Sequence, residues 1–249
     1  MKPQCRSLKA RLILTFAMLI LLSTSALSFV IGRQAEGEAE QKVGSLLGEQ
    51  ARHMINTLDK SMWTWTQEVE VLSSAITISG SGNHAITSAM LNAMQKSVPT
   101  FSWIGLTDDK GTVLASTGNV LLGQSIANRP VFQNGRTRLF AGDVHDAVML
   151  ANLLPNPTGD PMKFVDVSAP VRNGQNHEVG VLAAHLSWAW ARDVEKNIIK
   201  NSSTGEGVEM FVIARDGTVL LGKGYKGHAL SLPLLQTARK NGVAWDVQT

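Results

Sequence analysis

The fold is indicated first by a hairpin pattern that occurs twice, as IGLTDDKGTVL at Ile104–Leu114 and as FVIARDGTVL at Phe211–Leu220. In each copy an apolar, β-forming run leads into an acidic turn that glycine closes, and Thr-Val-Leu follows. Glycine suits such turns because they demand a positive φ. Gly111 and Gly217 lie 106 residues apart, about the length of a small domain. A single hairpin of this kind is common, but two at domain spacing predict a duplicated module.

Further strands and helices are predicted around the two hairpins. The strands are expected at residues 101–106, 112–115, 164–171, 179–186, 210–214 and 218–221. A short helix is expected at His84–Ser97, after a clear break at Ser79–Asn83. A second is expected at Trp188–Ile199, before a break at Lys200–Gly205. This mixture of helices and strands predicts an α+β fold.

A long helix is predicted over residues 34–78. Its apolar residues recur at mostly three- and four-residue steps, as an amphipathic helix requires: Leu46, Leu47, Met54, Leu58, Met62, Trp65, Val69 and Leu72. One interpretation is a stalk that rises from a membrane and then packs on a domain. A core-packing helix explains the stripe equally well.

An uncharged run of 20 residues, Leu12–Ile31, precedes this helix. As a helix it would measure roughly 30 Å, the thickness of a bilayer core. Four basic residues and no acidic ones precede it, at Lys2, Arg6, Lys9 and Arg11. The positive-inside rule then predicts residues 1–11 in the cytoplasm, one span at 12–31 in a bacterial inner membrane, and an extracytoplasmic body. The alternative is a cleaved signal peptide, for which Ala26-Leu27-Ser28 offers small residues.

Composition excludes several function classes. The formal net charge is +3, but without the four N-terminal basic residues the chain carries 19 basic and 20 acidic residues. A near-neutral body offers no basic face for a phosphate backbone, so nucleic-acid binding is not expected. The only cysteine, Cys5, precedes the apolar run, which excludes disulfides and cysteine-based metal sites from the body.

Catalytic motifs are absent from the sequence. It has no Gly-x-Ser-x-Gly, no His-Glu-x-x-His and no phosphate-cradling loop, and we do not expect an enzyme or a cofactor. The run Asp143-Val144-His145-Asp146 invites interpretation as a metal site or a catalytic dyad. Neighbouring histidine and aspartate are frequent by chance, however, so no metal is expected there.

Taken together, five segments resemble the double Cache sensor family of bacterial receptors. They are Phe101–Leu106 with Asp109–Gly111, Ile126–Phe132, Ala141–His145, Val167–Arg172 and Gly180–Ser187. The resemblance implies two PAS-like modules with antiparallel sheets, beside a long helix that leaves the membrane. It implies a membrane-distal module at 79–200 that binds the ligand, and a partial membrane-proximal module at 201–249.

The resemblance also bears on the function. It implies a ligand-sensing region of a signal-transduction receptor, in a homodimer, and is strongest to sensors joined to diguanylate cyclases. Because the sequence stops at Thr249, we expect an incomplete second module, with a second span and any cyclase or kinase activity in residues not present. The alternative is a secreted or tethered periplasmic small-molecule-binding module without its own output.

Family members that bind amino acids place a tyrosine, an arginine, a tryptophan, a second tyrosine and an aspartate around the ligand. The matching positions here hold Gln124, Arg129, Val131, Phe132 and His185. Arginine grips a carboxylate through paired hydrogen bonds, whereas a neutral histidine cannot replace a carboxylate beside an ammonium group. The resemblance therefore implies a small carboxylate, such as an organic acid, rather than an α-amino acid.

Trp103, Asp143 and His145 complete the candidate ligand-binding set. Each candidate also has a structural interpretation. Arg129 could cap a helix or pair with a surface acid, and Phe132 and Trp103 could be core aromatics. His185, in an apolar strand, could be a hydrogen-bonded core histidine.

Overall fold

The computed structural model describes residues 8–79, 82–146, 150, 152–155, 162–200, 208–214, 216–222, 236 and 240. The chain divides into two units, residues 1–51 with 231–249, and residues 52–230. The second unit contains every described strand and every described helix except the first part of α1.

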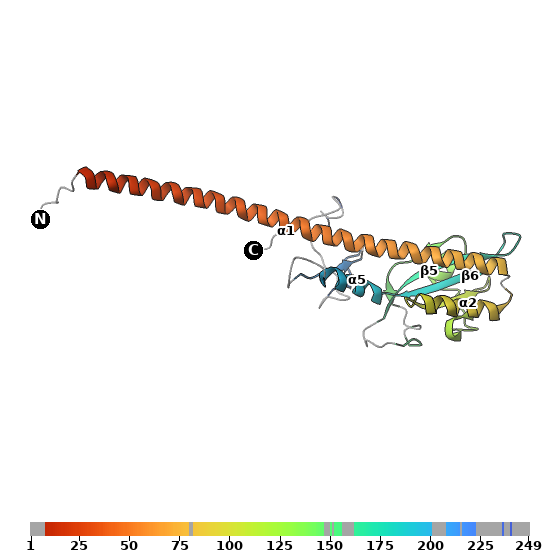
Figure 1. The fold of residues 1–249 in the computed structure, drawn as a ribbon. Helices are drawn as coiled ribbons and strands as arrows, with labels where there is room; N and C mark the ends of the chain where they lie inside the picture. Colours follow the sequence, from red (N-terminus) through yellow and green to blue (C-terminus); the bar gives the residue numbers. More distant parts are fainter. Residues whose placement is uncertain are drawn as a thin grey trace. The chain divides into compact units, whose positions relative to one another are not determined.

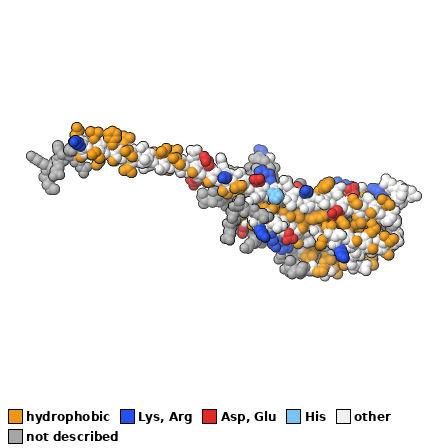
Figure 2. Space-filling model, viewed as in Figure 1, with side chains coloured by type: hydrophobic (Ala, Val, Ile, Leu, Met, Phe, Trp, Pro, Cys, Tyr) orange, Lys and Arg blue, Asp and Glu red, His pale blue; other side chains and the backbone are white. Residues whose placement is uncertain are grey.

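Helix α1 extends over Leu8–Ser79 and joins the two helical segments that the sequence predicts separately. No proline interrupts these 72 residues, so nothing in the sequence breaks the backbone hydrogen bonds after the apolar run. Apolar side chains gather on its N-terminal section and are exposed (Figure 2), for example Leu19 and Leu21. The section has a mean hydropathy of 2.2 and is long and apolar enough to cross a membrane, as an N-terminal signal sequence also is.

The central sheet is antiparallel throughout, in the order β2-β1-β6-β5-β3, with β4 also paired to β5. Figure 1 shows β5 and β6 side by side. Its strands are β1 Phe101–Thr107, β2 Val113–Ser116, β3 Phe140–Ala141, β4 His145–Asp146, β5 Lys163–Arg172 and β6 Glu178–Ser187. The four longer strands lie within one residue of the predicted ends. The fold class is therefore confirmed: helices combined with an antiparallel sheet, after a long apolar N-terminal helix.

Alternation along the strands gives the sheet two apolar faces. On one face, Val167 and Leu182 pack with Val69 of α1 and with Leu91 of α2, which spans His84–Ser97 as predicted. The other face carries a second cluster, which includes Trp103, Val113, Phe132, Phe164 and Val181. The short helix α3, Pro130–Gly135, covers this second face.

Both repeated sequences form antiparallel hairpins, β1–β2 and the shorter pair β7 (Val212–Ile213) and β8 (Val219–Leu221). The turn glycines Gly111 and Gly217 have φ values of 85° and 94°. In the first turn, burial would raise the pKa of Asp108, but backbone N–H groups of Thr112 and Lys110 donate to its carboxylate and lower that pKa. The backbone N–H of Thr218 likewise lowers the pKa of Asp216 in the second turn.

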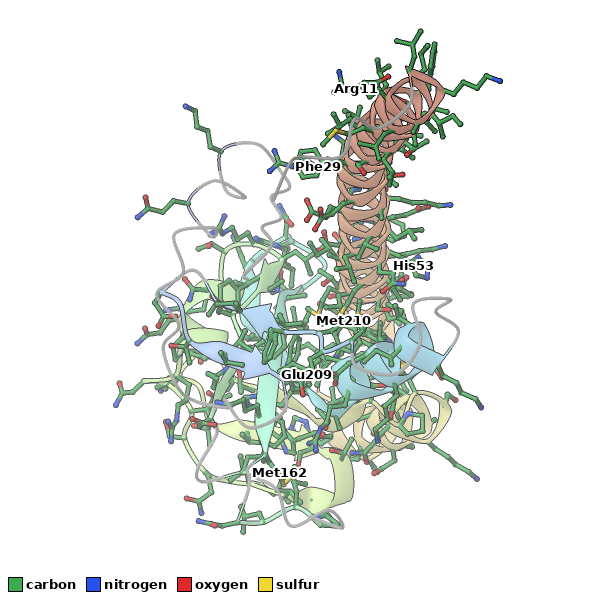
Figure 3. All side chains as sticks on the ribbon, turned by 90° about the vertical axis from the view of Figure 1, so that its left-hand side faces the viewer. Arg11, Phe29, His53, Met162, Glu209 and Met210 are labelled. Atoms are coloured by element: carbon green, nitrogen blue, oxygen red, sulfur yellow. The ribbon has the colours of Figure 1, made fainter. Side chains whose placement is uncertain are left out.

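Helix α5, Ala189–Lys200, packs in a third cluster with β8 and with Met54 and Leu58 of α1. Met210, just before β7, belongs to the same cluster (Figure 3). Most of the predicted proximal module, at 201–249, lies outside the described residues, so the predicted domain boundaries stay a prediction.

Candidate functional site

A cavity of about 400 Å³ lies on the sheet face that α3 covers. This volume is in the range of small-molecule sites. The walls come from the segment before α3, the start of α3, the segment from β3 to β4, and strands β5 and β6. The lining residues are Leu121, Ile126, Arg129, Pro130, Val131, Phe140, Gly142, Asp143, His145, Asp146, Leu150, Asp166 and His185.

Three neighbouring strands contribute a polar group to this cavity. Asp166 on β5 stands directly opposite His185 on β6, and His145 on β4 stands opposite Phe164, two residues before Asp166. Because side chains alternate along a strand, all three project from one face. Asp166 Oδ1 lies 2.5 Å from His185 Nδ1 and 3.4 Å from His145 Nε2. Trp103 and Phe164 flank the His185 ring, with centroids 5.5 and 6.0 Å away.

Gly142, between β3 and β4, allows the segment that leads into β4 to approach this cluster. A Cβ atom at Gly142 would lie 3.2 Å from the Cβ of Asp166, closer than side chains normally come. The Gly142 N–H donates to the Asp166 carbonyl oxygen at 2.7 Å. The segment that carries Asp143 and His145 is thereby held against β5.

Arg129 is placed in the cavity by α3. It occupies the N-cap position, and Pro130 follows at the first helical position, where a missing N–H costs no hydrogen bond. Buried Ser168 on β5 donates from Oγ to the Val131 carbonyl at 2.6 Å, which fixes the helix on the sheet. The side chain of Arg129 makes no capping hydrogen bond, and none of the ion pairs between described residues involves it.

Charge is unevenly balanced around the cavity. Asp146 pairs with Lys163 at 3.1 Å, so its charge is largely offset. Asp143 accepts a hydrogen bond from the N–H of Val144. Asp166 is 5% exposed and faces two imidazole rings. An exposed arginine at one wall and a buried carboxylate at another make the cavity strongly polarised.

Five of the eight predicted ligand-binding residues line the cavity: Arg129, Val131, Asp143, His145 and His185. The other three do not. Gln124 is exposed and lies outside the lining. Trp103 and Phe132 are buried in the apolar cluster beneath, and the Trp103 indole N–H donates to the Val120 carbonyl at 2.9 Å. Their aromatic rings are used for packing, which was the structural alternative for both.

The residue that sequence reasoning missed is Asp166. Its signal was visible, because a carboxylate stands inside the largely apolar run FVDVSAPV of a predicted strand. Carboxylates are almost never buried without a partner or a ligand. The expectation of an acid rather than an α-amino acid rested on Arg129 and on His185 in place of the family's aspartate, and Asp166 places a carboxylate beside His185.

Comparisons with known proteins rest on structure alone. No protein-family model and no curated protein sequence matches the chain. The ligand-binding domain of the Pseudomonas aeruginosa amino acid chemoreceptor PctC, in complex with GABA, is 17% identical with a TM-score of 0.59, over 82% of this chain and 85% of that one. The Vibrio cholerae histidine kinase DctB sensor domain is 17% identical with a TM-score of 0.51, over 83% and 76%.

A third similar structure is an extracellular ligand-binding receptor from Desulfohalobium retbaense, at 16% identity and a TM-score of 0.57. The match covers 78% of this chain but only 33% of that receptor. At these identities the likeness establishes the fold. The chain therefore has the fold of extracellular ligand-binding sensor domains of chemoreceptors and histidine kinases, and those domains are not catalytic ones.

Proposed function

We propose that the chain is the extracytoplasmic sensing region of a membrane-anchored signalling receptor, and that it binds a small molecule with an anionic group at Arg129. The observation that carries the proposal is the cavity itself, enclosed by α3 and the sheet, with a guanidinium at its wall. A guanidinium binds a carboxylate through two parallel hydrogen bonds, which gives both affinity and orientation.

The anchor in this proposal is residues 12–31, with the body periplasmic. Exposed apolar side chains over this section of α1 support a lipid environment. The ligand signal passes to a cytoplasmic output domain, for which a diguanylate cyclase is the output that the family resemblance implies. We propose that the receptor works as a homodimer.

The test is a ligand screen on the full chain in detergent, read as thermal stabilisation. We expect small organic acids to raise the melting temperature. Because PctC is described with GABA and the Pseudomonas fluorescens chemoreceptor CtaA with L-valine, amino acids form the second arm of the screen. Stabilisation by amino acids with organic acids inert would overturn the organic-acid assignment while leaving the sensing function in place.

Arg129 is tested with Arg129→Met, which removes the charge while keeping a long side chain. Loss of a charged hydrogen-bonded partner should weaken binding of the acid about tenfold to hundredfold. Arg136→Met is the control, because Arg136 lies outside the cavity lining and pairs with Glu178 at 3.1 Å. Equal losses in the two variants would remove Arg129 from the binding site.

The second candidate is a periplasmic binding module without its own output, released by cleavage after the apolar run. The observation that favours it is the position of the apolar section at the N-terminus, where signal sequences lie. Mass spectrometry of the mature N-terminus separates the two candidates, since a retained anchor leaves residues 12–31 on the chain.

A further inference from the structure

One oxygen of Asp166 faces two imidazole nitrogens, and the protons in this cluster do not balance. His145 Nδ1 lies 3.1 Å from the carbonyl oxygen of Asp143, which can only accept, so this nitrogen carries the hydrogen. In a neutral ring, Nε2 is then a bare lone pair. This nitrogen lies 3.4 Å from Asp166 Oδ1, without a hydrogen bond of acceptable geometry between them. Two electron-rich atoms face each other unless a positive group lies between them.

The second pair in the cluster is also unsatisfied. Asp166 Oδ1 and His185 Nδ1 are close, yet neither atom forms a hydrogen bond of acceptable geometry with any residue that the structure describes. The Asp166 side chain is 7% exposed and that of His185 is 13% exposed, so water offers little compensation. Buried polar atoms without partners are rare and costly.

We propose that His145 Nε2, Asp166 Oδ1 and His185 Nδ1 bind a divalent transition metal, with Zn²⁺ as the best match. These three atoms lie within 4.8 Å of one another. Two imidazoles and one carboxylate suit zinc and its neighbours, whereas Mg²⁺ and Ca²⁺ prefer oxygen ligands alone. The sequence expectation of no metal considered only the run Asp143–Asp146, and the sheet brings His145 to partners outside that run.

The distances fit such a site with small adjustments. In a tetrahedral zinc site with bonds near 2.0–2.1 Å, neighbouring ligand atoms lie about 3.3 Å apart. The His145–Asp166 separation of 3.4 Å already matches, and His185 must move away from Asp166 by less than about 1 Å. The two histidine nitrogens, within 4.8 Å of each other, must approach by up to about 1.5 Å. The Asp143 carbonyl fixes the His145 ring from behind, as outer-shell acceptors do at metal sites.

Three protein ligands leave a fourth coordination position on a tetrahedral metal ion. This position would face the cavity, which the three ligand residues line. Without a metal, neutral histidines leave the cavity with more acidic than basic charge, since Asp143 and Asp166 outweigh Arg129. A divalent ion reverses that sign and places positive charge in the same cavity as the arginine. The metal would therefore complete an anion site between itself and Arg129, a step that rests on the function proposed above.

The metal is tested alone first, on the full untagged chain in detergent after treatment with a chelator. We expect saturable binding of one Zn²⁺ per chain by calorimetry, and a visible absorption band with Co²⁺ in its place. Mg²⁺ and Ca²⁺ should give no heat. His145→Ala should weaken Zn²⁺ binding by at least about tenfold. His145 is half-buried on a two-residue edge strand, so this variant should fold.

The control is His53→Ala, since His53 is exposed on α1 and points away from the sheet (Figure 3). It should bind Zn²⁺ as the unmodified chain does. An absence of saturable binding, or equal affinity in His145→Ala, overturns the metal site. Asp166→Asn gives a second check through loss of the Co²⁺ band.

A second measurement separates the metal site from the proposed function. The affinity for a stabilising organic acid is measured with Zn²⁺ and again with chelator, and we expect at least about tenfold weaker binding without metal. If Zn²⁺ binds but no acid does in either condition, the metal site stands and the proposed function fails. If the acid binds equally well in both conditions and Zn²⁺ does not bind, the proposed function stands and the metal site falls.

Discussion

Gly111 shows how one residue fixes the first hairpin. Its φ of 85° is unfavourable for other residues, and a Cβ there would lie 2.7 Å from the Cα of Ala127. We expect Gly111→Ala to destabilise the chain by about 1–3 kcal/mol, measured by chemical unfolding. Gly123→Ala is the matched control, with a φ of 74° and no atom within 4 Å of the added carbon. A loss no larger than that of the control would show that the contact with Ala127 has no cost.

Glu68 predicts a dependence of stability on pH. Burial raises the pKa of this α1 carboxyl above its ordinary value, and Oε2 has no hydrogen-bonding partner among described residues. The folded state therefore holds the proton more tightly than the unfolded state, so the ionised group destabilises the fold at neutral pH.

Replacement with Glu68→Gln should raise the melting temperature at pH 7. The gain should shrink as the pH falls through the raised pKa and vanish below the ordinary pKa of glutamate, where both states are protonated. Glu70→Gln, an exposed position on the same helix, should show no such trend. A gain that is constant with pH would contradict the assignment to ionisation.

Individual site residues were only partly predictable from the sequence. The family resemblance marks the positions of Arg129 and His185, and both residues line the cavity. Trp103 and Phe132 lie in the apolar cluster and not in the cavity lining, because an aromatic residue near a cavity packs equally well in the core below it. Asp166 was missed although a carboxylate within a largely apolar strand is a visible signal. The residues that it faces, His145 and His185, lie on other strands and cannot be read from a local pattern.

At the scale of elements, long periodic segments were predictable and short ones were not. Strands β5 and β6 and helix α2 follow from hydrophobic patterns over eight or more residues. Helix α3 and strand β4 are six and two residues long, too short for any period to emerge. They form because the sheet offers them partners, such as Ser168 for α3 and Phe164 for β4. Four of the thirteen residues that line the cavity lie on these two short elements, and Asp166 and His185 lie on the long strands.

The position of α3 should depend on Ser168. Removal of its buried hydroxyl in Ser168→Ala should cost about 1 kcal/mol in unfolding free energy, because the 2.6 Å bond to the Val131 carbonyl is lost. The same variant should weaken binding of the organic acid, since Arg129 stands at the start of this helix. Ser74→Ala, exposed on α1, is the control. Normal acid binding in Ser168→Ala would show that α3 is held by packing alone.

For the whole molecule, the central prediction is retention in a membrane. An arginine at the middle of the apolar section, Leu21→Arg, should cost about 2.5–3.5 kcal/mol of insertion free energy. The fraction of chain that resists alkaline extraction from membranes should therefore fall. Leu122→Arg, at an exposed position of the body, should leave that fraction unchanged. If the unmodified chain is already extractable, residues 12–31 are not an anchor.

Strand β5 alone separates the cavity from the apolar residues that pack on α1. Asp166 faces the cavity, while its neighbours Val165 and Val167 pack on the side of α1. Farther along, Ser73 of α1 donates to the Pro170 carbonyl at 2.8 Å, and Thr77 accepts from the Arg172 N–H at 3.3 Å. A ligand that displaces Asp166 would therefore displace the residues of β5 that contact α1 directly. No intermediate side chains would be needed. The same strand, β5, would thus take part in both ligand sensing and signal transmission.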